Sequence, residues 1–388
     1  MANQWRRRLL SLSIISVSFI VGIAGGNLLR LQFQDKSQSP KIVPVADSTP
    51  KLLQPKISPS AIAETKLPYI TIKAVGDTIP GSNFPDDKLR SDRNELFPES
   101  VRVKFQDADI VFGNLETVLT NNPSSAKDTG REQIFAFRSP PIYAQLFADV
   151  GFNVFNVGNN HAMDFGQVGF QDTKKNLGAV GIKTIGEKDK ILYLQVKNIS
   201  IAIIGFCPYE FCNDVNDLAA TNALVKEAKT KAKIAIVSMH VGAEGTQALH
   251  VRNKTEIFLG ENRGNALKFA RTAIDSGADL VIGHGPHVPR AMEVYKGKLI
   301  AYSLGNFLGY RTLSTEAETG YSMILEVKVN LQGDLISSKI IPMYLDRQGI
   351  PHVDEDFRTV KLLRNLITSD FAETPMSINQ QGEVVFAQ

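Results

Sequence analysis

Four of the six histidines in the chain follow short apolar runs, at the points where buried strands are expected to end. They are His161, His240, His284 and His287. Imidazole is a common metal ligand and transfers protons near neutral pH. Satisfied core histidines are the alternative, but four of them would have to follow strands by coincidence. The recurrence favours one shared site.

Carboxylate and amide side chains occupy the same kind of position. Asp77, Asn114, Glu116 and Asn160 each follow an apolar run. Ligands of open α/β sheets bind outside the carboxyl ends of the strands, so we expect these groups to converge. Asn114 and Glu116 are two residues apart and should face the same way as Asp77. Around Asn160 an ordinary turn is the alternative, because Asn and Gly favour turns.

Carboxylate, amide and imidazole groups together suit Mn²⁺, Fe or Zn²⁺. The sequence therefore predicts a centre for one or two divalent metal ions. The elements that must position it alternate from residue 69 onward, which indicates βαβ units and an α/β fold. Strands are expected at 69–75, 109–112, 154–157, 199–205, 234–238 and 280–282, and helices at 140–149, 168–180, 219–232, 264–276 and 357–367.

The later apolar runs follow one another without a helix between them. They lie at 298–303, 321–329 and 335–344. This spacing indicates antiparallel pairing and a second sheet. We find no boundary within this region and expect one domain over 68–388, with a C-terminal extension from about 346.

Composition limits the classes of function. The chain has 388 residues, 43% of them hydrophobic, and a net charge of +3. A core of ordinary size is expected. The near-neutral charge and the single Trp give no electrostatic or stacking case for nucleic-acid binding.

The N-terminus has the pattern of export. Arg6, Arg7 and Arg8 precede an uncharged stretch at 9–29 that is long enough to span a bilayer. We expect a cytoplasmic stub and membrane anchor over 1–33, which places the rest outside the cytoplasm as a single-pass membrane protein. A cleaved signal peptide, and hence a secreted or periplasmic protein, is the alternative. Residues 34–67 are rich in Pro and Ser and are expected to form a tether.

The two cysteines, Cys207 and Cys212, flank a short loop directly after an expected strand. A disulfide is a plausible pairing if the domain is exported, because oxidising compartments preserve such bonds. Metal binding by two thiols alone is the less favoured alternative.

Seven motifs carry a family resemblance. They are GD at 76–77, GNLE at 113–116, FRSPP at 137–141, GNNHAMDFG at 158–166, HVGAE at 240–244, GADLVIGHGPH at 277–287 and SLGNF at 303–307. Together they resemble the capsule-synthesis CapA family over about residues 69–344. That family is similar to the calcineurin-like metallophosphoesterases, so the resemblance implies a four-layer αββα sandwich with metals at the strand ends.

The resemblance also implies roles for single residues. Asp77 and His287 would bind a first metal, Asn160, His240 and His284 a second, and Glu116 would bridge them. His161 would be the catalytic acid that is not a ligand. Arg138 and Asn114 are candidate substrate contacts, Arg138 because its planar guanidinium fits carboxylate or phosphate.

Two departures from the phosphoesterase pattern matter. Ile79 stands where a histidine ligand is usual, and Asn114 stands where the bridging Asp is usual. The first site therefore loses a ligand, and we expect one firmly held metal at the second site and a labile one at the first.

Two functions fit these observations. One is a membrane-anchored component of capsule or poly-γ-glutamate biosynthesis that binds an anionic polymer, works with other capsule-assembly proteins and carries a metallophosphoesterase-like site. The other is a metal-dependent phosphoesterase that acts outside the cytoplasm on a phosphate ester unrelated to capsule. Under either function we expect the membrane to be a partner of the protein.

Overall fold

The computed structural model describes residues 68–130 and 134–386, and two large β-sheets organise this part of the chain. One half of the ten-stranded sheet is parallel and has the order β1-β2-β5-β6. These strands are β1 (Tyr69–Ile79), β2 (Ile110–Leu115), β5 (Val154–Asn156) and β6 (Lys183–Ile185).

The other half of this sheet is antiparallel and continues from β1 in the order β17-β18-β21-β20. Two further strands pair outside this path, β16 with β1 and β19 with β18. The strands are β16 (Asn306–Gly309), β17 (Tyr321–Asn330), β18 (Leu335–Leu345), β19 (Pro351–Val353), β20 (Met376–Ile378) and β21 (Glu383–Phe386).

The seven-stranded sheet has the order β14-β15-β13-β10-β8-β7, and β9 pairs with β8. Its central strands are parallel, whereas β7 and β14 run antiparallel to their neighbours. The strands are β7 (Leu192–Val196), β8 (Ile199–Cys207), β9 (Asn213–Asp214), β10 (Ile234–His240), β13 (Leu280–His284), β14 (Met292–Tyr295) and β15 (Lys298–Ala301). Two short pairs complete the strands, β3 (Val118–Leu119) with β4 (Arg138–Ser139) and β11 (Ile257–Phe258) with β12 (Glu261–Asn262).

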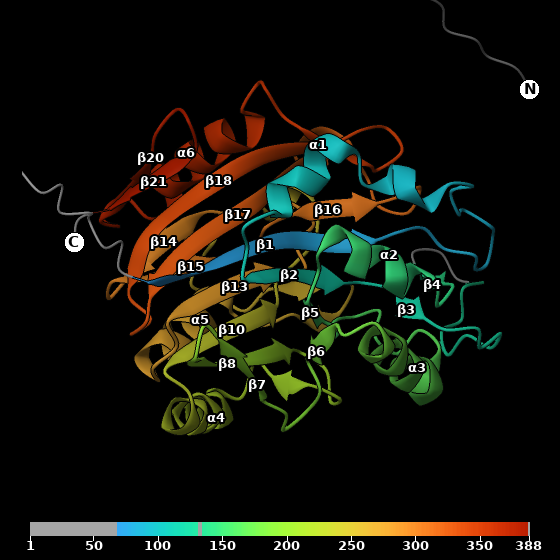
Figure 1. Ribbon diagram of the computed structural model, residues 1–388, viewed down its shortest axis with the longest axis horizontal. Coiled ribbons are helices and arrows are strands. Elements are labelled where there is room, and N and C mark those ends of the chain that lie inside the picture. The colour runs from blue at the N-terminus through green and yellow to red at the C-terminus, as the bar shows by residue number, and fades with distance from the viewer. Residues whose placement is uncertain (1–67, 131–133, 387–388) are drawn as a thin grey trace, which may run out of the picture. The chain divides into compact units, whose positions relative to one another are not determined.

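The two large sheets share one core, and helices cover their other faces (Figure 1). In β1, Ile70, Ile72 and Ala74 pack with strands of the seven-stranded sheet, whereas Val75 packs towards α2 and α3. Alternation along a strand explains this division. The helices are α1 (Glu99–Arg102), α2 (Tyr143–Val150), α3 (Gly166–Ala179), α4 (Leu218–Lys231), α5 (Ala266–Asp275) and α6 (Arg358–Asp370).

The expected α/β fold with more than one sheet is confirmed, but the grouping of the late strands was wrong. β17 and β18 pair with each other antiparallel, as expected. β17, however, pairs with β1 in the first sheet, and β15 pairs with β13 in the other. The hydrophobic pattern of a segment predicts that it is a buried strand, but it does not predict which neighbouring strand it pairs with. The residues after about 346 form β19, α6, β20 and β21, and β21 pairs with β18.

Among the described residues, no helix is long and apolar enough to cross a membrane. The predicted anchor or signal segment and the tether lie outside the described residues.

The structure joins Cys207 and Cys212 in a disulfide at the end of β8. A short covalent loop restricts the unfolded chain, so we predict that the double substitution Cys207→Ala with Cys212→Ala lowers the free energy of unfolding by about 2 kcal/mol in urea denaturation. The free energy of unfolding of the wild-type protein should fall by the same amount in the presence of reductant. Two titratable thiols in the unreduced wild type would contradict the pairing.

A second prediction concerns the buried carboxylate at the end of α6. Asp370 accepts a hydrogen bond from the backbone N–H of Val251 (2.9 Å), and its Oδ1 lies 2.7 Å from both Arg252 Nη1 and His250 Nδ1. Burial raises the pKa of Asp370, but the bonds from Arg252, His250 and Val251 outweigh burial and lower it.

A carboxyl group whose pKa is lowered in the folded state stabilises the fold at pH values above its unfolded pKa. This stabilisation is lost as the pH falls through the folded pKa. Asp370→Asn should therefore be less stable than wild type at pH 7, and the gap should narrow as pH falls below about 4, near the ordinary Asp pKa. Denaturation over a pH series measures this. A gap that does not change with pH would show that the charge of Asp370 is irrelevant.

Candidate metal centre

The register of the strands brings the polar groups together where the two large sheets meet, a region that we call the seam. In the ten-stranded sheet Asp77 lies opposite Asn114, and Asn114 lies opposite Asn156. In the seven-stranded sheet His240 lies opposite His284. Parallel strands end at the same edge, so both sheets present their polar ends side by side.

The end of β1 is irregular just before Asp77. The register with β2 shifts between Ala74 and Asp77, and a Cβ on Gly76 would lie only 1.9 Å from the carbonyl oxygen of Gly305. A bulge bends a strand and changes the direction of the next side chain. Glycine at position 76 permits the close approach that accompanies this change.

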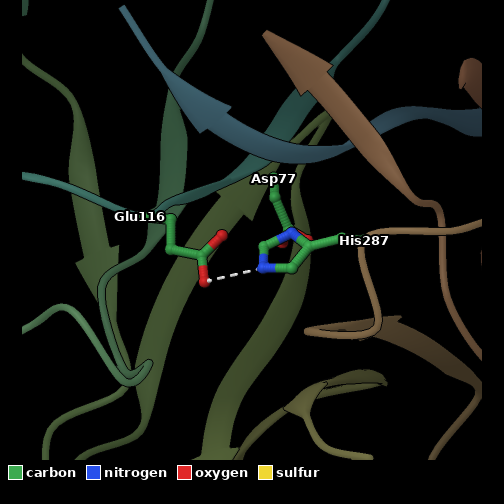
Figure 2. Close-up of side chains that lie close together, drawn as sticks. All are labelled: Asp77, Glu116 and His287. Atoms are coloured by element: carbon green, nitrogen blue, oxygen red, sulfur yellow. Dashed lines mark ion pairs between the residues drawn. The ribbon is translucent and has the colours of Figure 1, made fainter. Parts of the chain in front are cut away.

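Asp77, Glu116 and His287 form a cluster whose ligand atoms all lie within 4.8 Å of one another (Figure 2). Asp77 Oδ2 is 3.1 Å from His287 Nδ1, and Glu116 Oε1 is 3.8 Å from His287 Nε2. Glu116 Oε1 is also 3.8 Å from His240 Nε2. Glu116 thus lies between two histidines, which fits the expected bridging role.

Several buried atoms around the seam have no hydrogen-bond partner. They are Asp77 Oδ2, both carboxylate oxygens of Glu116, Asn160 Oδ1, His240 Nε2 and His284 Nδ1. Nearly all buried polar atoms in proteins are paired, and an unpaired buried carboxylate is costly. These six atoms are all electron-pair donors of types that first-row divalent metals accept. The residues present therefore fit a metal centre.

The second nitrogen of His284 is oriented by the opposite sheet. His284 Nε2 lies 3.1 Å from the carbonyl oxygen of Val75, and the ring packs against Phe112 with centroids 5.8 Å apart. A ligand histidine usually donates its other N–H to such an oxygen. His284 Nδ1 is left free to bind.

Burial and mutual charge shift the titration of these groups in opposite directions. Burial raises the pKa of Asp77, but contact with His287 and the charges of the other two histidines outweigh it and lower it to about 2. Burial raises the pKa of Glu116 well above its usual value. Burial lowers the pKa of His240 and His284, which keeps both neutral and able to donate a lone pair. For His287, the carboxylates Glu116 and Asp77 outweigh burial and raise the pKa well above its usual value.

Asn114 belongs to the framework of the centre. Its Nδ2 donates to Asp77 Oδ1 (2.8 Å) and lies 3.3 Å from His240 Nδ1. Its Oδ1 accepts from Asn156 (2.8 Å) and Asn159 (3.3 Å). The amide is fully buried and uses its donors and its acceptor inside the protein. We therefore treat Asn114 as a positioning residue in place of a substrate contact.

Arg138 is likewise committed to internal contacts. Its three guanidinium nitrogens donate to the side chain and backbone oxygens of Asn83 and to the backbone oxygen of Asn122. The guanidinium also lies over the rings of Phe84 and Phe165. These bonds hold the loops together and leave Arg138 a poor candidate for gripping a substrate.

His161 lines a cavity of about 730 Å³ beside the centre, together with Asn160 and Glu244. Its Nδ1 is 2.8 Å from Asp164 Oδ2, and its ring packs on Phe137 at 4.5 Å between centroids. Burial lowers the pKa of His161, although Asp164 opposes the shift. The carboxylate of Asp164 orients the ring and leaves Nε2 for chemistry.

Sequence reasoning missed Asp164, Asn306 and Glu244. Asp164 is three residues after His161, a spacing that could have indicated a histidine–carboxylate pair. Asn306 lies opposite Asp77 in β16, and its Oδ1 is 2.9 Å from His287 Nδ1. Asn306 lies in the SLGNF motif at 303–307, but the motif alone does not show its contact, which depends on two distant segments meeting.

Comparison with known proteins identifies the family. Residues 71–311 match the family of the bacterial capsule synthesis protein PGA_cap. The chain belongs to this family. A similar relative is the PGA biosynthesis protein CapA of Bacillus subtilis (strain 168), 30% identical over 307 residues, which cover 72% of this chain and 76% of the relative. The predicted membership of the CapA family is confirmed.

Other members are more distant. The capsule biosynthesis protein CapA of Bacillus anthracis is 25% identical over 62% of this chain and 59% of its own length. A probable polyglutamine synthesis accessory protein of Mycobacterium tuberculosis (strain CDC 1551 / Oshkosh) is 26% identical over 67% of this chain and 71% of its own length. Among solved structures, a 5'-nucleotidase precursor from Thermus thermophilus aligns with a TM-score of 0.43 and 13% identity, over 78% of this chain and 59% of that one.

The geometry does not rank the two expected metal sites by affinity. The most compact group is Asp77, Glu116 and His287, the set expected to hold the labile ion. The ranking of affinities stays a prediction, and the structure favours neither ion as the weaker. What the distances support is a central role for Glu116.

We predict that Glu116→Gln lowers the metal content per chain more than either His240→Ala or His287→Ala. Glu116 lies 3.8 Å from both histidines, so its loss affects both ions, whereas each histidine serves one. Elemental analysis after dialysis measures the content. His352→Ala, a histidine far along the chain in β19, is the control and should keep the wild-type value. Wild-type metal content in Glu116→Gln would exclude bridging.

Proposed function

We propose that this protein is a membrane-anchored, extracytoplasmic component of capsule or poly-γ-glutamate biosynthesis whose domain acts through a divalent metal centre. Family membership supports the pathway, and the relatives named for capsule and PGA biosynthesis support it further. The observation that carries the metal centre is the set of six buried, unpaired ligand atoms at the seam. The four-layer metallophosphoesterase-type arrangement is part of the same proposal.

The export part of the proposal comes from the N-terminal sequence, with its three arginines, apolar stretch and Pro/Ser-rich tether. The disulfide supports it, since such bonds persist in oxidising compartments. The expected partners are the membrane, an anionic polymer or phosphate-bearing substrate, and other capsule-assembly proteins. The metal is expected to be Mn, Fe or Zn.

The proposed chemistry assigns separate tasks to the residues. Asp77, Glu116, Asn160, His240, His284 and His287 would hold one or two metal ions, which supply Lewis-acid chemistry when bound. His161 would transfer a proton at Nε2 while Asp164 holds its ring. Phe137 packs on the ring and excludes water from one side. The cavity beside His161 leaves room for a substrate.

A phosphoesterase unrelated to capsule is the second candidate. The His161–Asp164 pair favours it, because a buried proton-transfer pair beside a metal centre suits hydrolysis of an ester. A protein that only binds polymer has no need of such a pair. The two candidates share the site and differ in the substrate.

Complementation of a deletion strain tests the proposal. Deletion should lower extracellular polymer, and the wild-type gene should restore it. If the domain is catalytic, His161→Ala should behave as the deletion and lower turnover by about 10² to 10⁴-fold. If the domain only binds polymer, His161→Ala should restore polymer fully.

His352→Ala is the matched control, and it should restore polymer in either case. An unchanged surface in the deletion strain would refute the capsule role. Turnover of phosphate esters that needs His161, together with an unchanged surface, would favour the second candidate.

A further inference from the structure

Glu244 ends the HVGAE motif, and neither the sequence nor the proposed chemistry gives it a task. It follows β10 in the loop that begins at His240, and its side chain is 20% exposed. The loop is pinned beside His287, because Gly245 N–H donates to the carbonyl oxygen of Pro286 at 2.9 Å. The backbone thus holds Glu244 next to the cluster of Figure 2.

The two oxygens of Glu244 point to different partners. Oε1 is 3.2 Å from Arg263 Nη1, and Oε2 is 3.7 Å from His287 Nε2. Arg263 is itself fixed, since it is almost fully buried and its guanidinium lies over the rings of Tyr209 and Phe258. A carboxylate held through one oxygen presents the other in a defined direction, as the supporting contacts of metal ligands do.

The orientation of His287 determines which nitrogen is available to a metal. Nδ1 faces two oxygens, Asn306 Oδ1 at 2.9 Å and Asp77 Oδ2 at 3.1 Å. The nearer acceptor, Asn306 Oδ1, favours a proton on Nδ1, so a metal ion bound by His287 would take the place of the proton on Nε2. Nε2 faces Glu116 Oε1 at 3.8 Å and Glu244 Oε2 at 3.7 Å.

This cluster lacks the ligand that position 79 would normally supply. Ile79 is fully buried and has no donor atom. Both oxygens of Glu116 are buried and without a hydrogen-bond partner. A cation bound between Glu116 and His287 would compensate the buried carboxylate. Glu244 lies outside the compact group of Asp77, Glu116 and His287, but its Oε2 is 3.7 Å from the same imidazole nitrogen.

We propose that Glu244 is a ligand of the metal ion held by Asp77, Glu116 and His287, and that it replaces the histidine missing at Ile79. The inference rests on the proposed metal centre and deepens it. The ligand set becomes three carboxylates and one imidazole, which is harder than the usual set and favours Mn²⁺ over Zn²⁺ at this site. Arg263 is the positioning residue that directs Glu244.

Equilibrium dialysis of the full chain against Mn²⁺ tests this. Glu244→Gln keeps the size of the side chain and removes the charge, and it should weaken binding of one Mn²⁺ by about tenfold or more, the scale seen when a ligand's surroundings are altered. Glu261→Gln is the matched control, because Glu261 also pairs with Arg263, at 2.9 Å, and lines the same cavity. It should bind Mn²⁺ as wild type does.

The outcomes separate this inference from the proposed function. Wild-type binding in Glu244→Gln would overturn the role of Glu244 and leave the metal centre standing. Equal weakening in Glu244→Gln and Glu261→Gln would show that only the Arg263 pairing matters, and would also overturn it. Failure of the wild type to bind Mn²⁺, Fe or Zn²⁺ would overturn both. If Glu244→Gln does not fold, as judged by circular dichroism, Glu244→Ala takes its place with the same expected loss.

Discussion

Two carboxylates, Asp77 and Glu116, lie fully buried in the seam between the sheets, and the rest of the site follows from the need to neutralise them. An ionised group removed from water costs several kcal/mol unless charge and hydrogen bonds compensate. Asn114 donates a hydrogen bond to Asp77 and His287 lies within 3.1 Å of it, but Glu116 has no hydrogen-bond donor. A positive charge bound near Glu116 would therefore be strongly favourable. A buried carboxylate in this state favours the binding of cations, but it does not stabilise the fold.

The convergence of the candidate ligand groups could be predicted because it depends on short-range patterns. Asp77 and His284 directly follow apolar runs, and the ends of buried parallel strands are where polar side chains can gather. The two-residue spacing of Asn114 and Glu116 correctly placed both on the side of Asp77. These inferences needed only the period of a strand and the edge at which parallel strands end.

Roles that depend on the partners of a side chain could not be predicted. Arg138 has the chemistry of an anion-binding residue, but its guanidinium bonds to two loops that the sequence does not connect with it. Asn306 contacts His287 because β16, a short strand that the sequence did not lead us to expect, pairs with β1. A missed strand thus hid a residue of the site. Residue type shows what a side chain can do, and only the fold shows what remains free to do it.

The candidate ligand atoms come from both sheets, Asp77 in β1 and Glu116 directly after β2 on one side, and His240 in β10 and His284 in β13 on the other. An ion held by both sets can bind only while the sheets are packed together, so it binds the folded chain and not the unfolded one. Mass action then adds to stability, by about 2.7 kcal/mol when the free ion is at a hundred times its dissociation constant. Resistance to proteases, and with it the amount of protein that persists, would follow the supply of metal in the surroundings.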